Sequence, residues 1–197
     1  WIADNQIVDD PRSALHRAIV VTDVERLERF ETFDAYTNAF SLEGSLGDAL
    51  FLAEKNSIFP DRAQIAALDA YVREFLQDDI QNPADGAVGS MLSDIGSVAL
   101  NFGRAKVYPR VGSLYHSLAW IAEHHAGLSA GADHYLRLAW RTWMALFRYG
   151  LSSRNSHVGI PGYAHVYEML NDLVHAGMTD EAATLRGRID GRPRALL

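Results

Sequence analysis

The sequence predicts an all-α protein, and three observations support that prediction. Apolar residues recur with the 3.6-residue period of a helix in several segments, most clearly between Pro60 and Ile80. No segment shows the alternating apolar and polar pattern that is typical of a β-strand. Residues that favour helix ends, such as Gly127 and Ser129, separate the periodic segments. We therefore expect antiparallel helical hairpins.

The composition indicates one folded domain and excludes several classes of protein. The chain has 197 residues, of which 48% are hydrophobic, so residues 1–197 can form a single domain with a sizeable core. A net charge of −7 argues against a nucleic-acid partner, because phosphate contacts need a basic face. The absence of cysteine excludes disulfides and thiolate metal sites. No apolar run reaches the roughly 18 residues of a membrane span.

The expected helices can be placed from their periodicity and from their end signals. Residues 1–9 are expected to be an irregular lead-in. In the first half, helices are expected from Asp10-Pro11 to about Val21, from Thr22 or Asp23 to about Asn38, from Ser45, and from Pro60 to about Ile80. In the second half, helices are expected from about Arg110 to His125, over about 130–149, from Tyr163 to Gly177, and from Thr179 to about Asp190.

The connections between these helices alternate between tight and long. Tight connections are expected near 58–60, 126–129 and 177–179, and longer ones near 40–44, 81–108 and 150–161. In an up-and-down array every second connection falls at the same end, so the three longer loops should converge on one end. Since function tends to sit on loops held by a rigid scaffold, we expect the site at that end.

The residues near the longer loops suit glycoside hydrolysis. That reaction needs two carboxyl groups, one to protonate the leaving oxygen and one to activate water or attack the sugar. We predict Asp94 and Glu43 for these two catalytic roles. Aromatic rings that stack on sugars and groups that hydrogen-bond to hydroxyls would line the groove, and the residues predicted for this role are Tyr108, Arg110, Tyr115, His116, Asn155, His157 and Tyr163.

Simpler interpretations of these residues stay open. Glu43 could be a solvated loop residue, and Asp94 could stabilise a turn, where aspartate is favoured. His116 and His157 could each be a hydrogen-bonded structural histidine. Trp140 and Trp143 are expected in the core.

The sequence predicts no metal and no cofactor. It contains no G-x-S-x-G, H-E-x-x-H or phosphate-binding G-x-x-x-x-G-K motif. His165 and Glu168 share a helix face, but no second pair of metal ligands accompanies them. The run Glu123-His124-His125 is interpreted as the solvated last turn of a helix.

Three stretches carry a resemblance to a known family: NFGRAKVYPRVGSLYHSLAWIAEHH, YLRLAWRTWMALFRYG and GYAHVYEMLNDLVHAGMTDEAATLRGRI. They resemble the toroid of bacterial six-hairpin (α/α)6 glycosidase-like proteins, over roughly residues 40–190. The resemblance implies part of an (α/α) toroid, a carbohydrate substrate, and a secreted or periplasmic bacterial protein. It carries no motif that identifies the acid and the base.

The chain is expected to be a segment of something larger. It begins with Trp1 and has no signal-peptide pattern. It contains roughly three hairpins where the toroid needs six, and half a ring would expose an apolar flank. We therefore expect a partner, either the remainder of the parent protein or another chain that completes the toroid.

Two other functions stay open. The first is a polysaccharide lyase on the same fold, in which Tyr115, His116, Asn155 and Arg110 would act on a uronate sugar. The acidic net charge argues mildly against this function, because uronate polymers are acidic too. The second is a non-catalytic helical module that binds sugar or serves as a scaffold.

Overall fold

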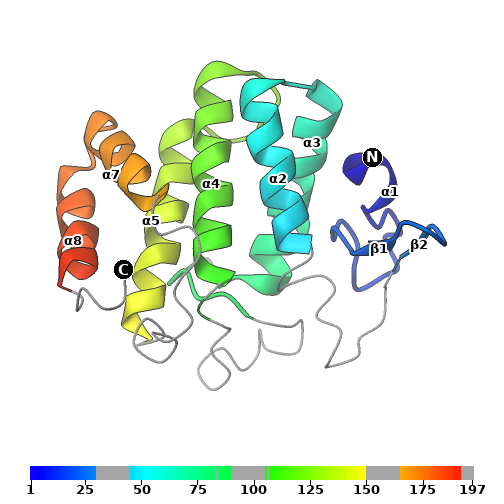
Figure 1. Cartoon of the computed structure of the whole chain (residues 1–197), viewed down its shortest axis with the longest axis horizontal. Coiled ribbons are helices and arrows are strands. Elements are labelled where there is room, and N and C mark those ends of the chain that lie inside the picture. Colours follow the sequence, from blue (N-terminus) through cyan, green and yellow to red (C-terminus); the bar gives the residue numbers. More distant parts are fainter. Residues whose placement is uncertain (30–44, 83, 90–104, 106, 150–164, 192–197) are drawn as a thin grey trace.

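The structure is a computed structural model that describes residues 1–29, 45–82, 84–89, 105, 107–149 and 165–191. Three helical hairpins stand side by side, and an N-terminal segment lies at one end of the row (Figure 1). Apart from two strands of two residues each, the regular elements of this described part are helices, which confirms the all-α class.

The N-terminal segment departs from the prediction. It contains the short helix α1 (Ile2–Asn5), and strands β1 (Thr22–Asp23) and β2 (Glu28–Arg29) pair antiparallel. The helix predicted up to Val21 is therefore wrong, and so is the start of a helix at Thr22 or Asp23.

Backbone pairing between distant residues explains this difference. The Val8 amide donates to the Ala18 carbonyl, and the Arg17 amide donates to the Val8 carbonyl, at 3.0 and 2.8 Å. Arg17 also has a φ of 65°, which a right-handed helix cannot contain. Asp10 and Asp23 accept from amides two or three residues ahead, as predicted for caps, but each such contact closes a turn with no helix after it.

The first hairpin joins α2 (Ser45–Ile58) to α3 (Arg62–Tyr71), which continues as the π-helix η1 (Val72–Ile80). The predicted helix start at Ser45 and helix end at Ile80 are both confirmed. Asp61 provides the cap of α3, since its side chain accepts from the amides of Ala63 and Gln64 at 2.9 and 3.1 Å.

The second and third hairpins also follow the predicted pattern. The second joins α4 (Val107–His124) to α5 (Ala132–Arg148), and the third joins α7 (His165–His175) to α8 (Thr179–Asp190). The tight turns contain Gly127 and Gly177 with φ of +125° and +77°, values that favour glycine. Ser129 does not cap α5 as predicted. Its amide and hydroxyl donate to Asp69 instead.

The core is built around α4, which packs mainly against α5 and α2. Trp143 is buried in it, as predicted, whereas Trp140 is half-buried and donates from Nε1 to the Glu181 carbonyl at 3.0 Å. The close approach of α4 and α5 depends on Gly112, where a Cβ atom would lie 2.6 Å from Trp143 Nε1.

A buried hydrogen-bond network joins the first hairpin to the second. Gln81, just beyond η1, donates from Nε2 to Thr142 Oγ1 of α5 at 2.8 Å. Its Oε1 accepts from the Tyr115 hydroxyl of α4 at 2.6 Å. Beside it, Gly86 has a φ of +78°, and a Cβ atom there would lie 2.5 Å from the Arg141 carbonyl oxygen.

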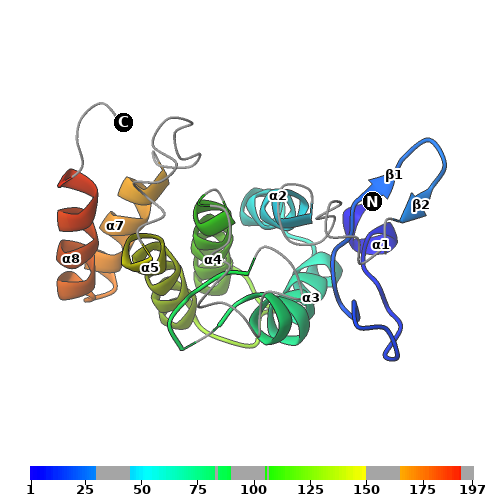
Figure 2. The same cartoon turned by 90° about the horizontal axis from the view of Figure 1, so that it is seen from below.

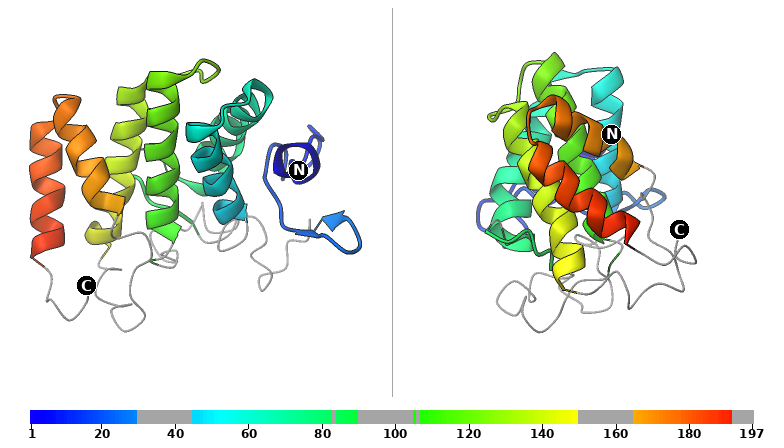
Figure 3. Two further views of the ribbon diagram at one scale, coloured as in Figure 1. Left: turned by 45° about the horizontal axis from the view of Figure 1, so that its top comes forward. Right: turned by 90° about the vertical axis from the view of Figure 1, so that its left-hand side faces the viewer.

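The hairpins share one orientation. The tight turns of all three lie at the same end, at the top of Figure 1, and the start of α4 and the ends of η1, α5 and α8 lie at the opposite end. Seen from below, α2, α4 and α7 lie along one face, while α3, η1 and α5 lie toward the other (Figure 2). Figure 3 shows the same parallel stacking of hairpins from two further directions. No helix in the described ranges has the length and apolar character needed to cross a membrane.

Candidate functional site

A groove of about 460 Å³ lies between α4, α5 and α7. We call it the α5-side groove. Its lining combines three histidines and three carboxylates with one tryptophan and small apolar side chains: His116, Ala119, Trp120, Glu123, His124, Ala132, Asp133, Leu136, Asp172, His175 and Ala176.

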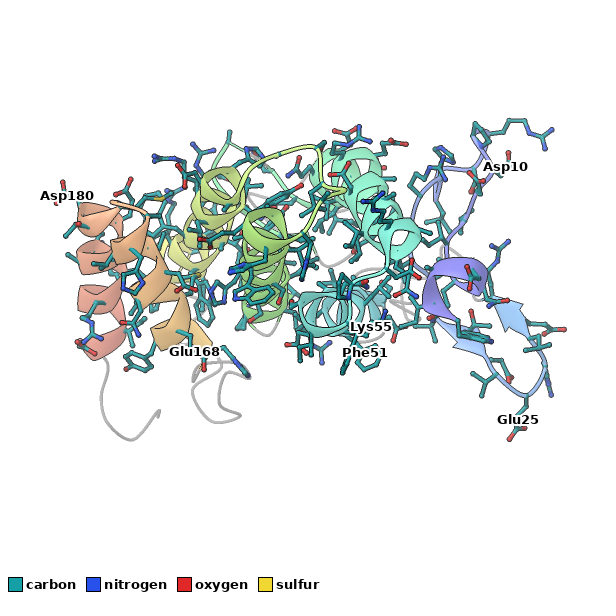
Figure 4. All side chains as sticks on the ribbon, turned by 90° about the horizontal axis from the view of Figure 1, so that it is seen from above. Asp10, Glu25, Phe51, Lys55, Glu168 and Asp180 are labelled. Atoms are coloured by element: carbon teal, nitrogen blue, oxygen red, sulfur yellow. The ribbon has the colours of Figure 1, made fainter. Side chains whose placement is uncertain are left out.

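A second groove of about 240 Å³ lies on the other side of α4, between α2 and α7. We call it the α2-side groove. It is lined by Glu54, Ser57, Ile58, Ser113, His116, Ser117, Trp120, His165 and Glu168. Glu168 of α7 lies on the same side of the molecule as Phe51 and Lys55 of α2 (Figure 4). The two grooves share His116 and Trp120.

Trp120 presents an exposed ring between the grooves, with 41% of its surface accessible. Its ring stacks on His124, with ring centres 3.9 Å apart and planes inclined by 16°. The two residues are one helical turn apart, and His124 Nδ1 also lies 2.9 Å from the Trp120 carbonyl oxygen. The stack therefore limits the orientations of the indole and leaves part of it open to a ligand.

His116 is held by a carboxylate from a different hairpin. Its Nε2 lies 2.6 Å from Asp172 Oδ2, and its side chain is mostly buried while that of Asp172 is nearly half exposed. A carboxylate only accepts, so we assign an N–H to Nε2, and in the neutral form of the ring the lone pair then lies on Nδ1. This pairing orients the imidazole, and it is an arrangement that acid–base catalysis uses.

The charge of the lining is one-sided. The two grooves together contain five carboxylates, which belong to Glu54, Glu123, Asp133, Glu168 and Asp172. Neither lining, as far as the chain is described, contains a lysine or an arginine. A neutral or positively charged ligand therefore suits these grooves better than an anion.

Two of the predicted sugar-binding residues are core residues in the structure. Tyr108 and Tyr115 are both buried, and neither lines a groove. The Tyr108 hydroxyl accepts from the Val88 amide at 3.3 Å, and burial raises the pKa of Tyr108 to about 12. Burial also raises the pKa of Tyr115, whose hydroxyl donates to Gln81. Both phenols stay protonated at neutral pH, and they anchor Val88 and Gln81 to α4.

Two of the other predicted site residues lie in the described part of the chain. His116 lines both grooves, and Arg110 is half-buried on the first turn of α4. Glu43, Asp94, Asn155, His157 and Tyr163 lie outside the described residues, so their roles stay predictions.

Most of the α4 residues that line the grooves belong to the half of the helix that leads to the tight turn, whereas the longer loops were expected to converge at the other half. The α5-side lining includes His124 at the end of α4, together with Ala132 at the start of α5 and Ala176 after α7. Sequence reasoning did not select Trp120 or Asp172 for the site. A signal existed for Trp120, because it is four residues from both His116 and His124 and so shares a helix face with them.

No group of three or more histidine, aspartate or glutamate side chains within the described ranges is arranged to hold a metal ion. His165 and Glu168, which share a helix face, have Nδ1 and Oε2 atoms 3.9 Å apart.

Comparison with known proteins gives one informative likeness. No family model matches the chain, and no curated protein matches it. A solved structure described as a polysaccharide lyase superposes with a TM-score of 0.75 at 19% sequence identity. The superposition covers 95% of this chain and 25% of that one, so the present chain spans about a quarter of the length of its structural neighbour. At this identity the likeness shows a shared helical fold.

Proposed function

We propose that the chain forms the helical part of a carbohydrate-active enzyme, and that the enzyme is a glycoside hydrolase acting on a poly- or oligosaccharide. The observation that carries the proposal is the exposed ring of Trp120, set between two grooves lined by carboxylates and histidines. An exposed aromatic face can stack on a sugar ring, and carboxylates are the groups that glycoside hydrolysis requires. The fold shared with a polysaccharide lyase supports a carbohydrate substrate by analogy.

Hydrolysis would use two carboxyl groups in different protonation states. One carboxylic acid gives its proton to the glycosidic oxygen, and the other carboxylate activates a water or attacks the anomeric carbon. Asp94 and Glu43 are the pair proposed from the sequence. Glu123 and Asp172 are the corresponding candidates from the α5-side groove.

Substitution of each pair separates these assignments. If Asp94 and Glu43 are the catalytic pair, Asp94→Asn and Glu43→Gln should each lower kcat by roughly 10²–10⁴-fold, which is the usual contribution of a positioned acid or base. If Glu123 and Asp172 are the pair, Glu123→Gln and Asp172→Asn should have that effect instead. The measurement is the release of reducing ends from a panel of neutral and charged glycans. The assay uses the natural full-length protein. Glu25→Gln, an exposed change in the β1–β2 turn, is the matched control. If all four variants retain full activity, carboxylate catalysis by these residues is excluded.

Polysaccharide elimination is the second candidate, and the His116–Asp172 pair is the observation that favours it. His116 Nδ1 would remove the proton beside a uronate carboxylate, the electron pair would form a carbon–carbon double bond, and the glycosidic oxygen would leave with a proton from an acid. The absence of lysine and arginine from the described linings counts against it, since a uronate needs a cation. Ultraviolet absorbance from an unsaturated product would identify elimination, whereas new reducing ends without that absorbance would identify hydrolysis.

A further inference from the structure

The two grooves meet along one stripe of α4. His116 and Trp120 are four residues apart and so lie one above the other on the same helix face. Both line the α5-side groove and the α2-side groove. A ligand that rests on the exposed ring of Trp120 can therefore extend to either side of α4.

The two sides differ in the groups they offer. The α2-side groove contains three hydroxyls, from Ser57, Ser113 and Ser117, with the carboxylates of Glu54 and Glu168 at its margins. Ser57 donates from its hydroxyl to the Ala53 carbonyl at 3.0 Å, which leaves its oxygen free to accept. The α5-side groove is instead dominated by carboxylates and imidazoles. Hydroxyl-rich ligands can form hydrogen bonds on both sides, but with different partners.

The volumes agree with an extended ligand. At about 460 and 240 Å³, the grooves together lie in the range of roughly 300–1,000 Å³ that is usual for small-molecule sites. A monosaccharide placed on Trp120 would leave one of the two sides empty.

We propose that the two grooves are one continuous binding site, in which a stretch of glycan with at least two uncharged or amino sugars crosses α4, with Trp120 stacking at the crossing point. This inference rests on the proposed carbohydrate function. The five carboxylates of the lining exclude uronates by like-charge repulsion, and they attract sugars that carry a free amine.

Binding measured against chain length tests the continuity of the site. Titration calorimetry would compare disaccharides with tetrasaccharides of neutral glucose, xylose and mannose, of glucosamine with free amines, and of galacturonate. For the wild type we expect a neutral or amino tetrasaccharide to bind at least about tenfold tighter than its disaccharide, a difference of about 1.4 kcal/mol. Galacturonate should bind weakest at each length.

Two variants should remove this advantage of length. Ser117 is half-buried in the lining of the α2-side groove, so the indole of Ser117→Trp would fill that groove. Glu168→Ala would remove a carboxylate from the same lining. We expect each variant to lose most of the gain in affinity from disaccharide to tetrasaccharide, because the α2-side half of the site is filled or altered. Glu168 is exposed, so its removal leaves the fold intact even if Ser117→Trp destabilises the chain. Glu25→Ala, on the exposed β1–β2 turn, is the control.

The outcomes separate this inference from the proposed function. Glycan binding that is independent of length, or that is unchanged in both variants, would overturn the continuous site and leave the carbohydrate function standing. Tighter binding of galacturonate would overturn the charge selection. If no glycan binds to the wild type, the proposed function fails, and this inference fails with it.

Discussion

Trp120 is the residue on which the candidate site depends. It keeps 41% of its surface exposed although it belongs to the central helix, and the stack on His124 limits its motion. Ordering a side chain in advance lowers the entropy that binding would otherwise cost. The exposed and partly fixed ring next to two grooves therefore supports the proposed role of Trp120 in sugar binding.

Replacing Trp120 by alanine should weaken glycan binding without unfolding the protein. We expect at least a tenfold loss of affinity, or about 1.4 kcal/mol, because the stacking surface is removed. Calorimetric titration with the best-bound oligosaccharide would measure it. Trp1, which is half exposed in the N-terminal segment, supplies the control variant Trp1→Ala. Equal loss of affinity in both variants would contradict a specific role for Trp120.

Asp69 is a buried carboxylate that ties α3 to the turn between α4 and α5. It accepts from the Ser129 amide and hydroxyl at 3.0 and 2.7 Å, from the Tyr135 hydroxyl at 3.1 Å and from Arg73 Nε at 3.0 Å. Burial by itself would raise the pKa of Asp69, but these hydrogen bonds outweigh it and hold the pKa below the usual value.

The lowered pKa of Asp69 makes stability depend on pH in the acid range. The unfolded chain binds this proton more readily, so the contribution is complete above the unfolded pKa of about 3.9 and is lost as the pH falls through the folded pKa. Asp69→Asn should destabilise the protein by roughly 1–3 kcal/mol at neutral pH. Urea unfolding at pH 7 and at pH 3 would show a smaller difference between wild type and variant at pH 3. A difference that does not change with pH would contradict this assignment.

At the scale of elements, helix ends follow local chemistry while helix contacts depend on a few small residues. α4 and α5 approach closely because Gly112 leaves room for the indole of Trp143. Gly47, in α2, has open space around it. These two helical glycines form a matched pair.

Replacing each of these glycines by alanine should shift stability in opposite directions. Gly112→Ala brings a Cβ atom to 2.6 Å from Trp143 Nε1, so we expect a loss of roughly 1–3 kcal/mol from overpacking. Gly47→Ala meets no atom within 4 Å and should gain about 0.5–1 kcal/mol from the better helix propensity of alanine. Denaturant unfolding of both variants gives the comparison. A stabilising Gly112→Ala would show that the helices can move apart at little cost.

At the scale of the whole molecule, three hairpins stand in a row, and polar contacts join neighbouring hairpins. Gln81 links the end of the first hairpin to both helices of the second. His116 and Asp172 link the second hairpin to the third. The row also leaves Phe51, Ile58 and Phe59 exposed on or just beyond α2. The partner expected from the sequence stays a prediction.

Removal of Gln81 should uncouple the first two hairpins. Gln81→Ala leaves the buried hydroxyl of Tyr115 without its partner, so we expect a loss of roughly 2–4 kcal/mol. Adding Tyr115→Phe should recover part of that loss, because the unpaired donor is then absent. A double-mutant cycle by urea denaturation measures the coupling. If the destabilising effects of Gln81→Ala and Tyr115→Phe simply add, the two side chains are not energetically coupled.

The sequence by itself determined the helical class, the three hairpins and their tight turns. Those features come from local signals: a 3.6-residue apolar period, Gly127 and Gly177 at positive φ, and the helix start at Ser45. Local signals failed before residue 29, where Asp10 and Asp23 form turns and where pairing between Val8 and Ala18 replaces a helix.

Only the tertiary structure decided which side chains meet. A periodic pattern places Tyr108 and Tyr115 on a helix but does not say whether they line the core or a groove, and packing placed both in the core. Asp172 reaches His116 across 56 positions of the chain, and Trp120 is exposed because α2, α5 and α7 leave grooves beside it. A helical period tells which face a residue occupies, but the neighbours that cover that face come from distant hairpins. For this reason the hairpins could be predicted from the sequence, and the grooves beside α4 could not.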